Sequence, residues 1–167
     1  MSEQARFPPV AELVPHEPPM LLVDELLEWS PEAASIGATI RAGSPFVHGD
    51  RMPATILLEL MAQAIAVANG MADRMAGRVA GELSSRPGHR AELSARPGHR
   101  AEVGLLLGTR ELELACEELS VGDTLELRVV REYADGKLAR YACTATRAEQ
   151  LLARATINVM TTTAEEI

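Results

Sequence analysis

Residues 52–70 read MPATILLELMAQAIAVANG, and this stretch decides the fold of the chain. Pro53 suits the first turn of a helix, where the missing N–H would have no partner and the fixed φ angle helps. Good helix formers follow it, and the run is interrupted by polar side chains at Thr55, Glu59 and Gln63. A helix that is apolar nearly all round needs cover on most sides, most simply from a curved sheet. We therefore expect a long central helix that begins near Pro53.

Glu59 is the first functional candidate on this helix. It stands four residues before Gln63, so the two side chains share one face. A carboxylate inside an apolar helix is costly unless it is paired or titrates differently from a free Glu. The alternative is that Glu59 faces solvent at a gap in the sheet, or accepts from a nearby backbone N–H, and has no chemical role.

Composition limits the possible classes of protein. A chain of 167 residues fits a single domain over 1–167, and 47% hydrophobic with 3% aromatic residues predicts an aliphatic core. A net charge of −8 argues against nucleic acid as a partner. An acidic carrier protein would need a local basic patch, which the arginines within residues 74–110 could supply.

Cys116 and Cys143 lie in apolar, strand-like contexts without a CxxC motif, so we expect two reduced, buried thiols. The chain does not open on a signal-peptide pattern, and its apolar runs carry polar breaks. A soluble cytoplasmic protein without a membrane partner is the expectation.

The N-terminal part is rich in proline, with five of the ten prolines in residues 1–20. We expect an extended lead-in over residues 1–12, with one short helical turn around residues 10–14. His16 follows, directly before the first apolar run, and its simplest role is structural, tying the lead-in to the body. Residues 20–29 fit a strand or a short amphipathic piece, and residues 34–41 fit a strand.

The loop FVHGDR, residues 46–51, delivers the chain to the central helix. It places the His48 imidazole and the Asp50 carboxylate near the helix N-terminus. Free N–H groups and the helix dipole favour developing negative charge at that point. The loop is therefore a suitable place for an oxyanion.

A tandem repeat follows the helix, which we expect to end at about Gly77. Residues 81–90 read GELSSRPGHR and residues 91–100 read AELSARPGHR. The unit is too short and too polar to form a solenoid, so a slipped duplication in a mobile loop over residues 78–102 is the better interpretation. His89 and His99 each lie between arginines, which is a poor environment for a cation, and no metal site is expected.

The second half of the chain has the texture of four antiparallel strands, over residues 103–116, 124–133, 137–148 and 150–161. Asp135-Gly136 between apolar-alternating arms is a strong hairpin signal. Leu125, Leu127 and Val129 alternate with more polar neighbours, as in a half-buried strand. One strand, a long buried helix and four antiparallel strands give an α+β fold in which the sheet curls around the helix.

Three stretches carry a family resemblance: VPHEPPMLLVDELLEW (14–29), PFVHGDRMPATILLELMAQAIAV (45–67) and GLLLGTRELELACEELSVGDTLEL (104–127). Together they resemble the bacterial 3-hydroxyacyl-(acyl carrier protein) dehydratases over residues 13–160, apart from the repeat. The resemblance implies a hot-dog fold, with a long central helix wrapped by a curved antiparallel sheet. It also implies at least a dimer, with active sites in tunnels at the subunit interface, and a catalytic role for Glu59.

The chain departs from the family pattern in the loop before the helix. Typical members carry a longer loop, G-H-F-P-G-x-P-x-M-P-G, whose histidine is the second catalytic residue. Here the loop is shortened to residues 49–54, and His48 lies before the glycine. The chain thus resembles a divergent branch without the usual loop histidine, some of whose members belong to gene sets for aryl polyene synthesis. The glycine that ends the family motif is replaced by Ala54, whose N–H would still face a thioester carbonyl.

Dehydration of a 3-hydroxyacyl thioester needs a base for the α-proton, an acid for the β-hydroxyl and a donor for the enolate-like oxygen. We assign Glu59 to the β-hydroxyl, His48 to the α-proton and the Ala54 N–H to the carbonyl oxygen. Asp50 is a weaker alternative base, and His16 comes third. The remaining residues expected at substrate-binding positions are Gln63, Met52 and Pro53.

Two other classes of function remain open. A hot-dog thioesterase would use Glu59 or Asp50 to activate water. A non-catalytic acyl-binding subunit would keep the helix and the tunnel beside a more complete dehydratase or a condensing enzyme. The expected partners are an acyl thioester, acyl carrier protein and further copies of the chain, as a dimer or a hexamer. No cofactor is expected, since the reaction needs neither metal nor nucleotide and no glycine-rich phosphate loop is present.

Overall fold

The computed structural model describes residues 7–84 and 102–163. A short helical turn η1 comes first, followed by eight strands and one long helix, α1. The bounds in chain order are η1 Val10–Glu12, β1 Glu25–Trp29, β2 Ala33–Thr39, β3 Arg51–Pro53, α1 Ile56–Ser84, β4 Glu102–Leu114, β5 Glu118–Ser120, β6 Thr124–Asp135, β7 Leu138–Arg147 and β8 Gln150–Thr163.

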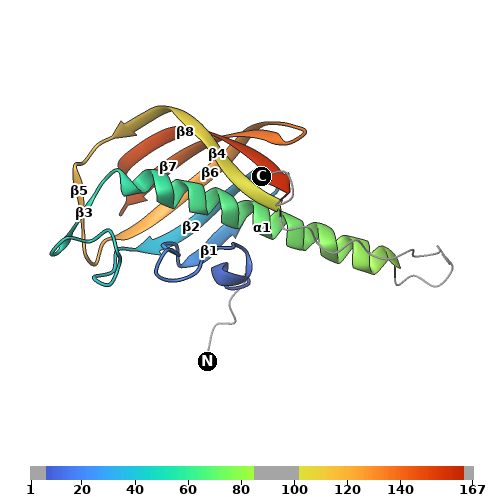
Figure 1. Ribbon diagram of the computed structural model, residues 1–167, viewed down its shortest axis with the longest axis horizontal. Coiled ribbons are helices and arrows are strands. Elements are labelled where there is room, and N and C mark those ends of the chain that lie inside the picture. The colour runs from blue at the N-terminus through green and yellow to red at the C-terminus, as the bar shows by residue number, and fades with distance from the viewer. Residues whose placement is uncertain (1–6, 85–101, 164–167) are drawn as a thin grey trace.

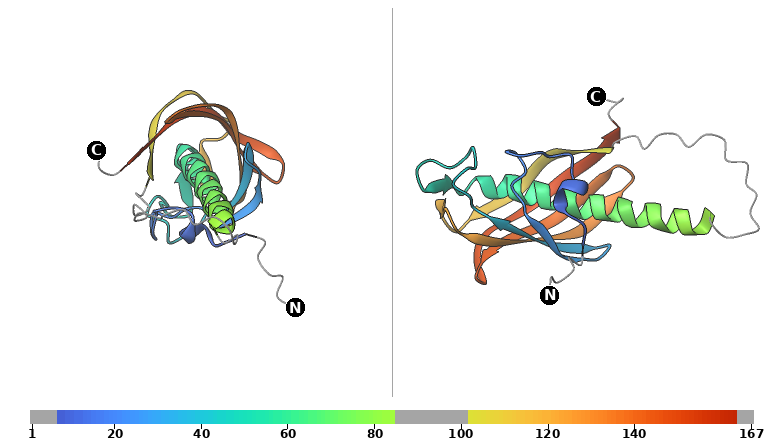
Figure 2. Two further views of the ribbon diagram at one scale, coloured as in Figure 1. Left: turned by 90° about the vertical axis from the view of Figure 1, so that its right-hand side faces the viewer. Right: turned by 90° about the horizontal axis from the view of Figure 1, so that it is seen from below.

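The main sheet has six antiparallel strands in the order β1-β2-β6-β7-β8-β4, and β3 and β5 form a separate two-stranded ribbon. The sheet curls around α1, as the view along the helix shows (Figures 1 and 2). Along β6, Leu125, Leu127 and Val129 are buried against the core while alternate residues are exposed. This arrangement confirms the expected α+β fold and the expected alternation in the second half of the chain.

The central helix is the core of the molecule, as expected from its apolar sequence. Leu57, Met61, Ala64 and Val67 are completely buried, and α1 packs mainly on β6, β2 and β7. The helix is long and apolar enough, by length and composition alone, to cross a membrane, but half of its most apolar window is buried inside the fold. Core helices of soluble proteins have the same property.

Both ends of the helix differ from the expectation. Pro53 ends β3 instead of beginning α1, because Met52 pairs with the buried Leu119 of β5 and this pairing holds the backbone extended. At the other end α1 continues past Gly77 to Ser84. Residues 78–84 are therefore helical, and the prediction of a loop from residue 78 is wrong for them. A glycine costs an exposed helix only about 1 kcal/mol relative to alanine, too little to end it. The tandem repeat from residue 85 onward lies outside the described residues.

The expected hairpins are both present. Gly136 in the β6–β7 turn has a φ angle of +55°, which glycine adopts without strain. The β7–β8 turn is built from Ala148 and Glu149, whose φ angles of +47° and +67° are both in the left-handed region. A two-residue turn of this kind matches the twist of the strands, but Asn and Gly are the residues that favour it.

An N-terminal segment, residues 13–22, crosses the helix on the side away from the sheet, and we call it the strap. It starts after η1, which confirms the expected helical turn. The strap passes so close to α1 at Gly70 that a Cβ atom there would lie 1.9 Å from the Leu13 carbonyl oxygen. Glycine at this position is therefore a condition for the close contact between strap and helix.

The two edges of the main sheet have different characters. Strand β1 is short, has a bulge between Leu26 and Glu28, and exposes acidic side chains. Strand β4 has 13 residues. Leu106 and Leu114 on β4 pair with the inward-facing Val159 and Ala153 of β8, yet they are 45% and 38% exposed. The concave side of β4 is therefore left uncovered by α1.

The two cysteines are free, as expected. Cys143 is buried as expected, whereas Cys116 is only half-buried, so the expectation of a buried thiol is not met at Cys116. Burial raises the pKa of the Cys143 thiol to about 12, with a smaller contribution from the negative charge of Glu132.

Candidate functional site

Glu59 and Gln63 form a hydrogen-bonded pair on the face of α1 that the strap covers. The Gln63 side chain is completely buried. Its Nε2 donates to Glu59 Oε1 at 2.9 Å and to the Met20 carbonyl oxygen at 2.8 Å, while its Oε1 accepts from the Leu22 N–H at 2.9 Å. Both amide hydrogens and the amide oxygen are thus engaged within the chain. Gln63 holds the Glu59 carboxylate and the strap in a fixed relation, and Glu59 itself stays partly accessible.

The loop before the helix is a tight turn whose side chains point to solvent. The His48 N–H donates to the Arg51 carbonyl at 2.8 Å and the Arg51 N–H returns to the His48 carbonyl at 3.2 Å. His48 is exposed, and the Asp50 side chain is 84% exposed with a loose ion pair to Arg51 at 3.7 Å. Over residues 7–84 and 102–163, no hydrogen bond or ion pair joins either side chain to Glu59.

The Ala54 N–H is not directed at a vacant site. It donates to the Glu117 carbonyl at 2.9 Å, and Ala54 is buried. The expectation that this N–H faces a thioester carbonyl is therefore not met in this structure, because the approach of the segment before β5 takes up the donor. The Leu57 N–H, one residue into α1, donates to the Ala54 carbonyl at 3.0 Å. The N–H groups of Thr55 and Ile56 precede it at the start of the helix.

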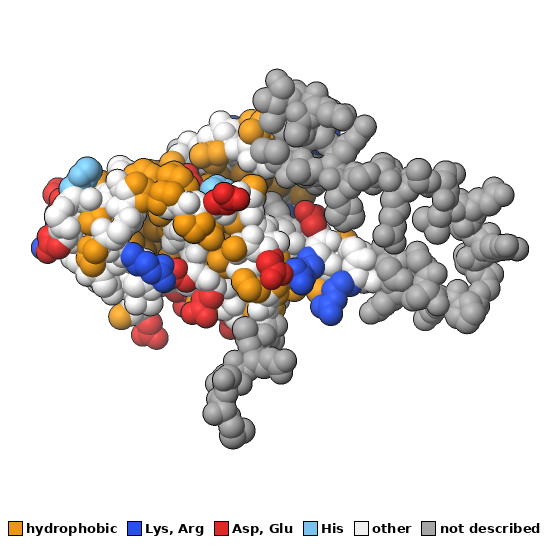
Figure 3. Space-filling model, turned by 60° about the horizontal axis from the view of Figure 1, so that its bottom comes forward, with side chains coloured by type: hydrophobic (Ala, Val, Ile, Leu, Met, Phe, Trp, Pro, Cys, Tyr) orange, Lys and Arg blue, Asp and Glu red, His pale blue; other side chains and the backbone are white. Residues whose placement is uncertain are grey.

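An apolar cavity of about 420 Å³ lies beside the strap. Met52 and Leu60 line it, so the structure brings Met52, though not the exposed Pro53, to a cavity wall. The Arg41 guanidinium lies at the cavity and pairs with Asp24. Other lining residues are Pro18, Pro19, Leu21, Leu22, Thr39 and Ile40. Hydrophobic side chains gather on the face that carries the strap (Figure 3).

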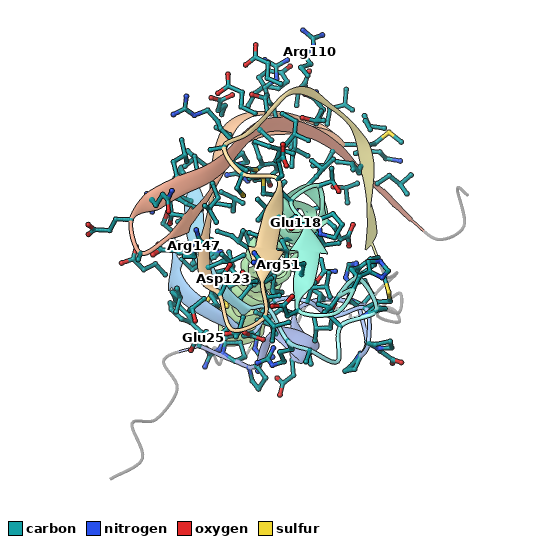
Figure 4. The ribbon with its side chains drawn as sticks, turned by 90° about the vertical axis from the view of Figure 1, so that its left-hand side faces the viewer. Glu25, Arg51, Arg110, Glu118, Asp123 and Arg147 are labelled. Carbon is teal, nitrogen blue, oxygen red and sulfur yellow. The ribbon has the colours of Figure 1, made fainter. Side chains whose placement is uncertain are left out.

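The described arginines are spread over several faces. Arg74 pairs with Glu12 at 2.9 Å, and Arg110 lies on the outside of the sheet (Figure 4). At the end of the molecule near the N-terminus of α1, Arg51 donates to Ser120 at 3.1 Å and Arg147 pairs with Asp123 at 2.7 Å. The arginines of the repeat, and the histidines His89 and His99, lie outside the described residues.

The sequence indicates a structural role for His16 and places it third among the candidate bases, and the structure adds one feature. Its Nδ1 atom is buried and has no hydrogen-bond partner, which holds for no other side-chain nitrogen or oxygen in the described part of the chain. Gln63 was expected to bind substrate, and its actual partners, Met20 and Leu22, lie too far away in sequence for any local pattern to indicate them.

A six-stranded antiparallel sheet curled around one long helix places the chain in the hot-dog class of folds. The chain belongs to the ApeP-like dehydratase family, whose model, described as ApeP dehydratase, matches residues 8–83 and 88–167.

Individual relatives agree with this assignment. A 3-hydroxyacyl-(acyl-carrier-protein) dehydratase FabZ from Anaeromyxobacter sp. (strain K) is 34% identical over 79 residues, which cover 40% of this chain and 51% of that protein. The match thus spans about half the length of the relative.

Among solved structures, the dehydratase heterocomplex ApeI:P from Xenorhabdus doucetiae superposes with a TM-score of 0.76 at 22% identity, covering 96% of this chain and 95% of that one. A hypothetical thioesterase with coenzyme A from Streptococcus pneumoniae TIGR4 gives 0.53 at 11% identity over 83% and 85%. Both show that the hot-dog fold expected from the sequence is correct.

Proposed function

We propose that this single-domain chain dehydrates 3-hydroxyacyl thioesters carried by acyl carrier protein, in fatty acid or aryl polyene-type lipid synthesis in the cytoplasm. Membership of the ApeP-like dehydratase family and the name of the FabZ relative support the reaction class. The observation that carries the proposal is the Glu59 carboxylate, fixed by the buried Gln63 amide in the apolar first half of α1. A carboxylate held in this way is suited to proton transfer at a defined point.

In the proposed reaction Glu59 gives a proton to the departing β-hydroxyl, which leaves as water. A second group removes the α-proton, and its C–H electron pair becomes the new double bond. Since the Ala54 N–H is engaged, the N–H groups of Thr55 and Ile56 are the donors proposed for the thioester oxygen. This oxygen gains negative charge as the α-proton leaves, and the positive end of the helix dipole favours that charge.

We further propose that the working assembly is at least a dimer formed through β4. This strand is a long edge with unpaired backbone groups, and Leu106, Leu107 and Leu114 are exposed on it. An edge of this kind pairs readily with another strand. A second copy of β4 would extend the sheet and cover the concave side of the strand, closing a tunnel over the Glu59 face. The hairpin that carries His48 and Asp50 could then approach the active site of the neighbouring subunit.

The test is hydration of crotonyl-pantetheine, followed through the loss of the ultraviolet absorbance of the enoyl thioester. The variants are Glu59→Gln and Glu59→Ala, compared with the wild type. Glu59→Gln keeps an oxygen that can accept from Gln63, so we expect it to fold normally and to lose at least about 100-fold in kcat, the contribution of a general acid. Normal turnover in Glu59→Gln would refute the assignment.

A second candidate is a non-catalytic acyl-binding subunit. The exposed positions of His48 and Asp50, with no contact to Glu59 in the described chain, support this candidate, because neither loop side chain is held beside Glu59. Wild-type protein that binds the acyl thioester without hydrating it would identify such a subunit. Release of free thiol, measured in the same sample, would identify a thioesterase instead.

A further inference from the structure

We propose that His16 is a catalytic residue of this site, the imidazole that takes the α-proton beside Glu59. The inference rests on the proposed dehydratase function and names a group that neither the loop motif nor the family comparison supplies. It follows from the path of the strap, from its link to Glu59 and from the state of the imidazole.

The strap runs along the stripe of α1 that carries Glu59. With 100° per residue, Glu59, Gln63 and Gly70 fall within about 40° of one another around the helix. Leu13 touches the helix at Gly70, and the backbone at Met20 reaches Gln63. His16 lies between these two anchors in the chain, and the proposal therefore places it over the same stripe, on the path from Gly70 toward the carboxylate.

The strap and the carboxylate are fixed to one another through a single side chain. The Gln63 amide that holds Met20 and Leu22 also donates to Glu59. After His16 the chain makes a tight turn, in which the N–H groups of Met20 and Leu21 donate to the Glu17 carbonyl at 2.8 and 3.1 Å. Two hydrogen bonds to Gln63 therefore hold the backbone on the C-terminal side of the imidazole on the helix, and two more close the turn before it. A proton-transfer group needs such a fixed frame.

The imidazole itself has an unused hydrogen-bonding atom. Leaving a buried polar atom without a partner costs about 1–3 kcal/mol. Within residues 7–84 and 102–163, His16 Nδ1 is the one buried side-chain nitrogen or oxygen in that state, whereas the neighbouring Gln63 is fully paired. An unpartnered buried atom calls for an explanation, and the one proposed here is a bound substrate. A bound substrate that places its reacting carbon here gives Nδ1 a proton to accept, and imidazole is the commonest side chain in this role.

The step balances as follows. Before the reaction, the two catalytic side chains Glu59 and His16 share one transferable proton, which is on Glu59. His16 Nδ1 takes the α-proton, the electrons of the C–H bond form the α,β double bond, and the β C–O bond breaks. Glu59 gives its proton to the departing oxygen, which leaves as water. The proton on His16 then returns to Glu59 and restores the starting state.

The kinetic test compares His16→Ala and His16→Gln with Glu17→Ala, a neighbouring exposed residue that tests disturbance of the strap. We expect kcat for crotonyl-pantetheine hydration to fall by about 100-fold or more in both His16 variants, with KM changed less than kcat. Added imidazole should restore part of the activity of His16→Ala, and Glu17→Ala should resemble the wild type. Turnover in His16→Ala within threefold of the wild type would overturn the proposal, as would loss of activity in His48→Ala alone.

A second measurement uses the wild-type protein and does not depend on folding of a variant. Histidine labelled with ¹³C gives ring signals, and His16→Gln identifies the one from residue 16. We expect this signal to shift when crotonyl-pantetheine is added. An unchanged His16 signal while other signals report binding refutes the inference. If the wild type does not hydrate the thioester, the proposed dehydratase activity is refuted. The His16 signal then shows separately whether this imidazole faces the thioester.

Discussion

Replacing Gln63 with Met tests whether one side chain fastens the strap to the helix. The change keeps the length of the side chain and removes all three hydrogen bonds of the amide. The Leu22 N–H, the Met20 carbonyl and one Glu59 oxygen then lose their partner. A net value of about 0.5–1.5 kcal/mol for each bond gives a loss of about 1.5–4.5 kcal/mol in the free energy of unfolding. The loss falls in the upper half of this range if the orphaned groups stay buried.

Urea unfolding measures this loss, with the fluorescence of Trp29 as the signal. Trp29 is the one tryptophan of the chain, and its Nε1 donates to the Ala68 carbonyl of α1 at 3.0 Å, so it reports on the helix and the sheet together. With a slope of about 2 kcal/mol per molar urea, the midpoint should fall by about 1–2 M at fixed protein concentration. Gln150→Met, at an exposed residue at the start of β8, should change stability by less than about 0.5 kcal/mol. A loss below about 1 kcal/mol for Gln63→Met would refute the reasoning.

Four further substitutions test three local features by the same unfolding assay. Gly70→Ala should destabilise the protein by about 2 kcal/mol or more, because the new Cβ would collide with the Leu13 carbonyl. Gly77→Ala, whose Cβ would meet open space, should instead stabilise the helix by up to about 1 kcal/mol. Equal effects of the two substitutions would contradict the contact between strap and helix. Glu149→Gly should add about 1 kcal/mol by relieving a left-handed residue in the β7–β8 turn. Burial raises the pKa of Cys143 from 9.0 to about 12, so the folded state holds the thiol proton more tightly than the unfolded state. The contribution of this thiol to the free energy of unfolding is therefore complete below pH 9 and is lost as the pH rises toward 12. Cys143→Ala should flatten this decline, and an unchanged slope would argue against the raised pKa.

The sequence predicted the central helix, the four late strands and the α+β plan because each has a strong periodicity of its own. The ends of α1 were less predictable. Pro53 satisfies the rule for a first helical turn, but its neighbour Met52 gains more by packing against Leu119 in a ribbon of three-residue strands. Strands that short carry too few residues for any periodicity to show.

The candidate site was predictable only where its residues are local to one element. Glu59 stands out because a carboxylate in an apolar helix is rare. The role of Gln63 depends on backbone groups of the strap some 40 positions earlier in the chain, and no local pattern records that contact. The unpaired state of His16 is likewise a product of tertiary packing. The loop motif drew attention to His48 instead.

The difference between the two sheet edges limits how far the molecule can assemble. In the dimer proposed above, two six-stranded sheets joined at β4 would form one continuous sheet whose outer edges are both β1. At those edges the short length, the bulge and the exposed Glu25 and Glu28 oppose addition of another strand. Addition of further strands would therefore stop at the dimer, because both β4 edges are already paired with one another. A chain with two edges like β4 would add copies without limit, as fibres do.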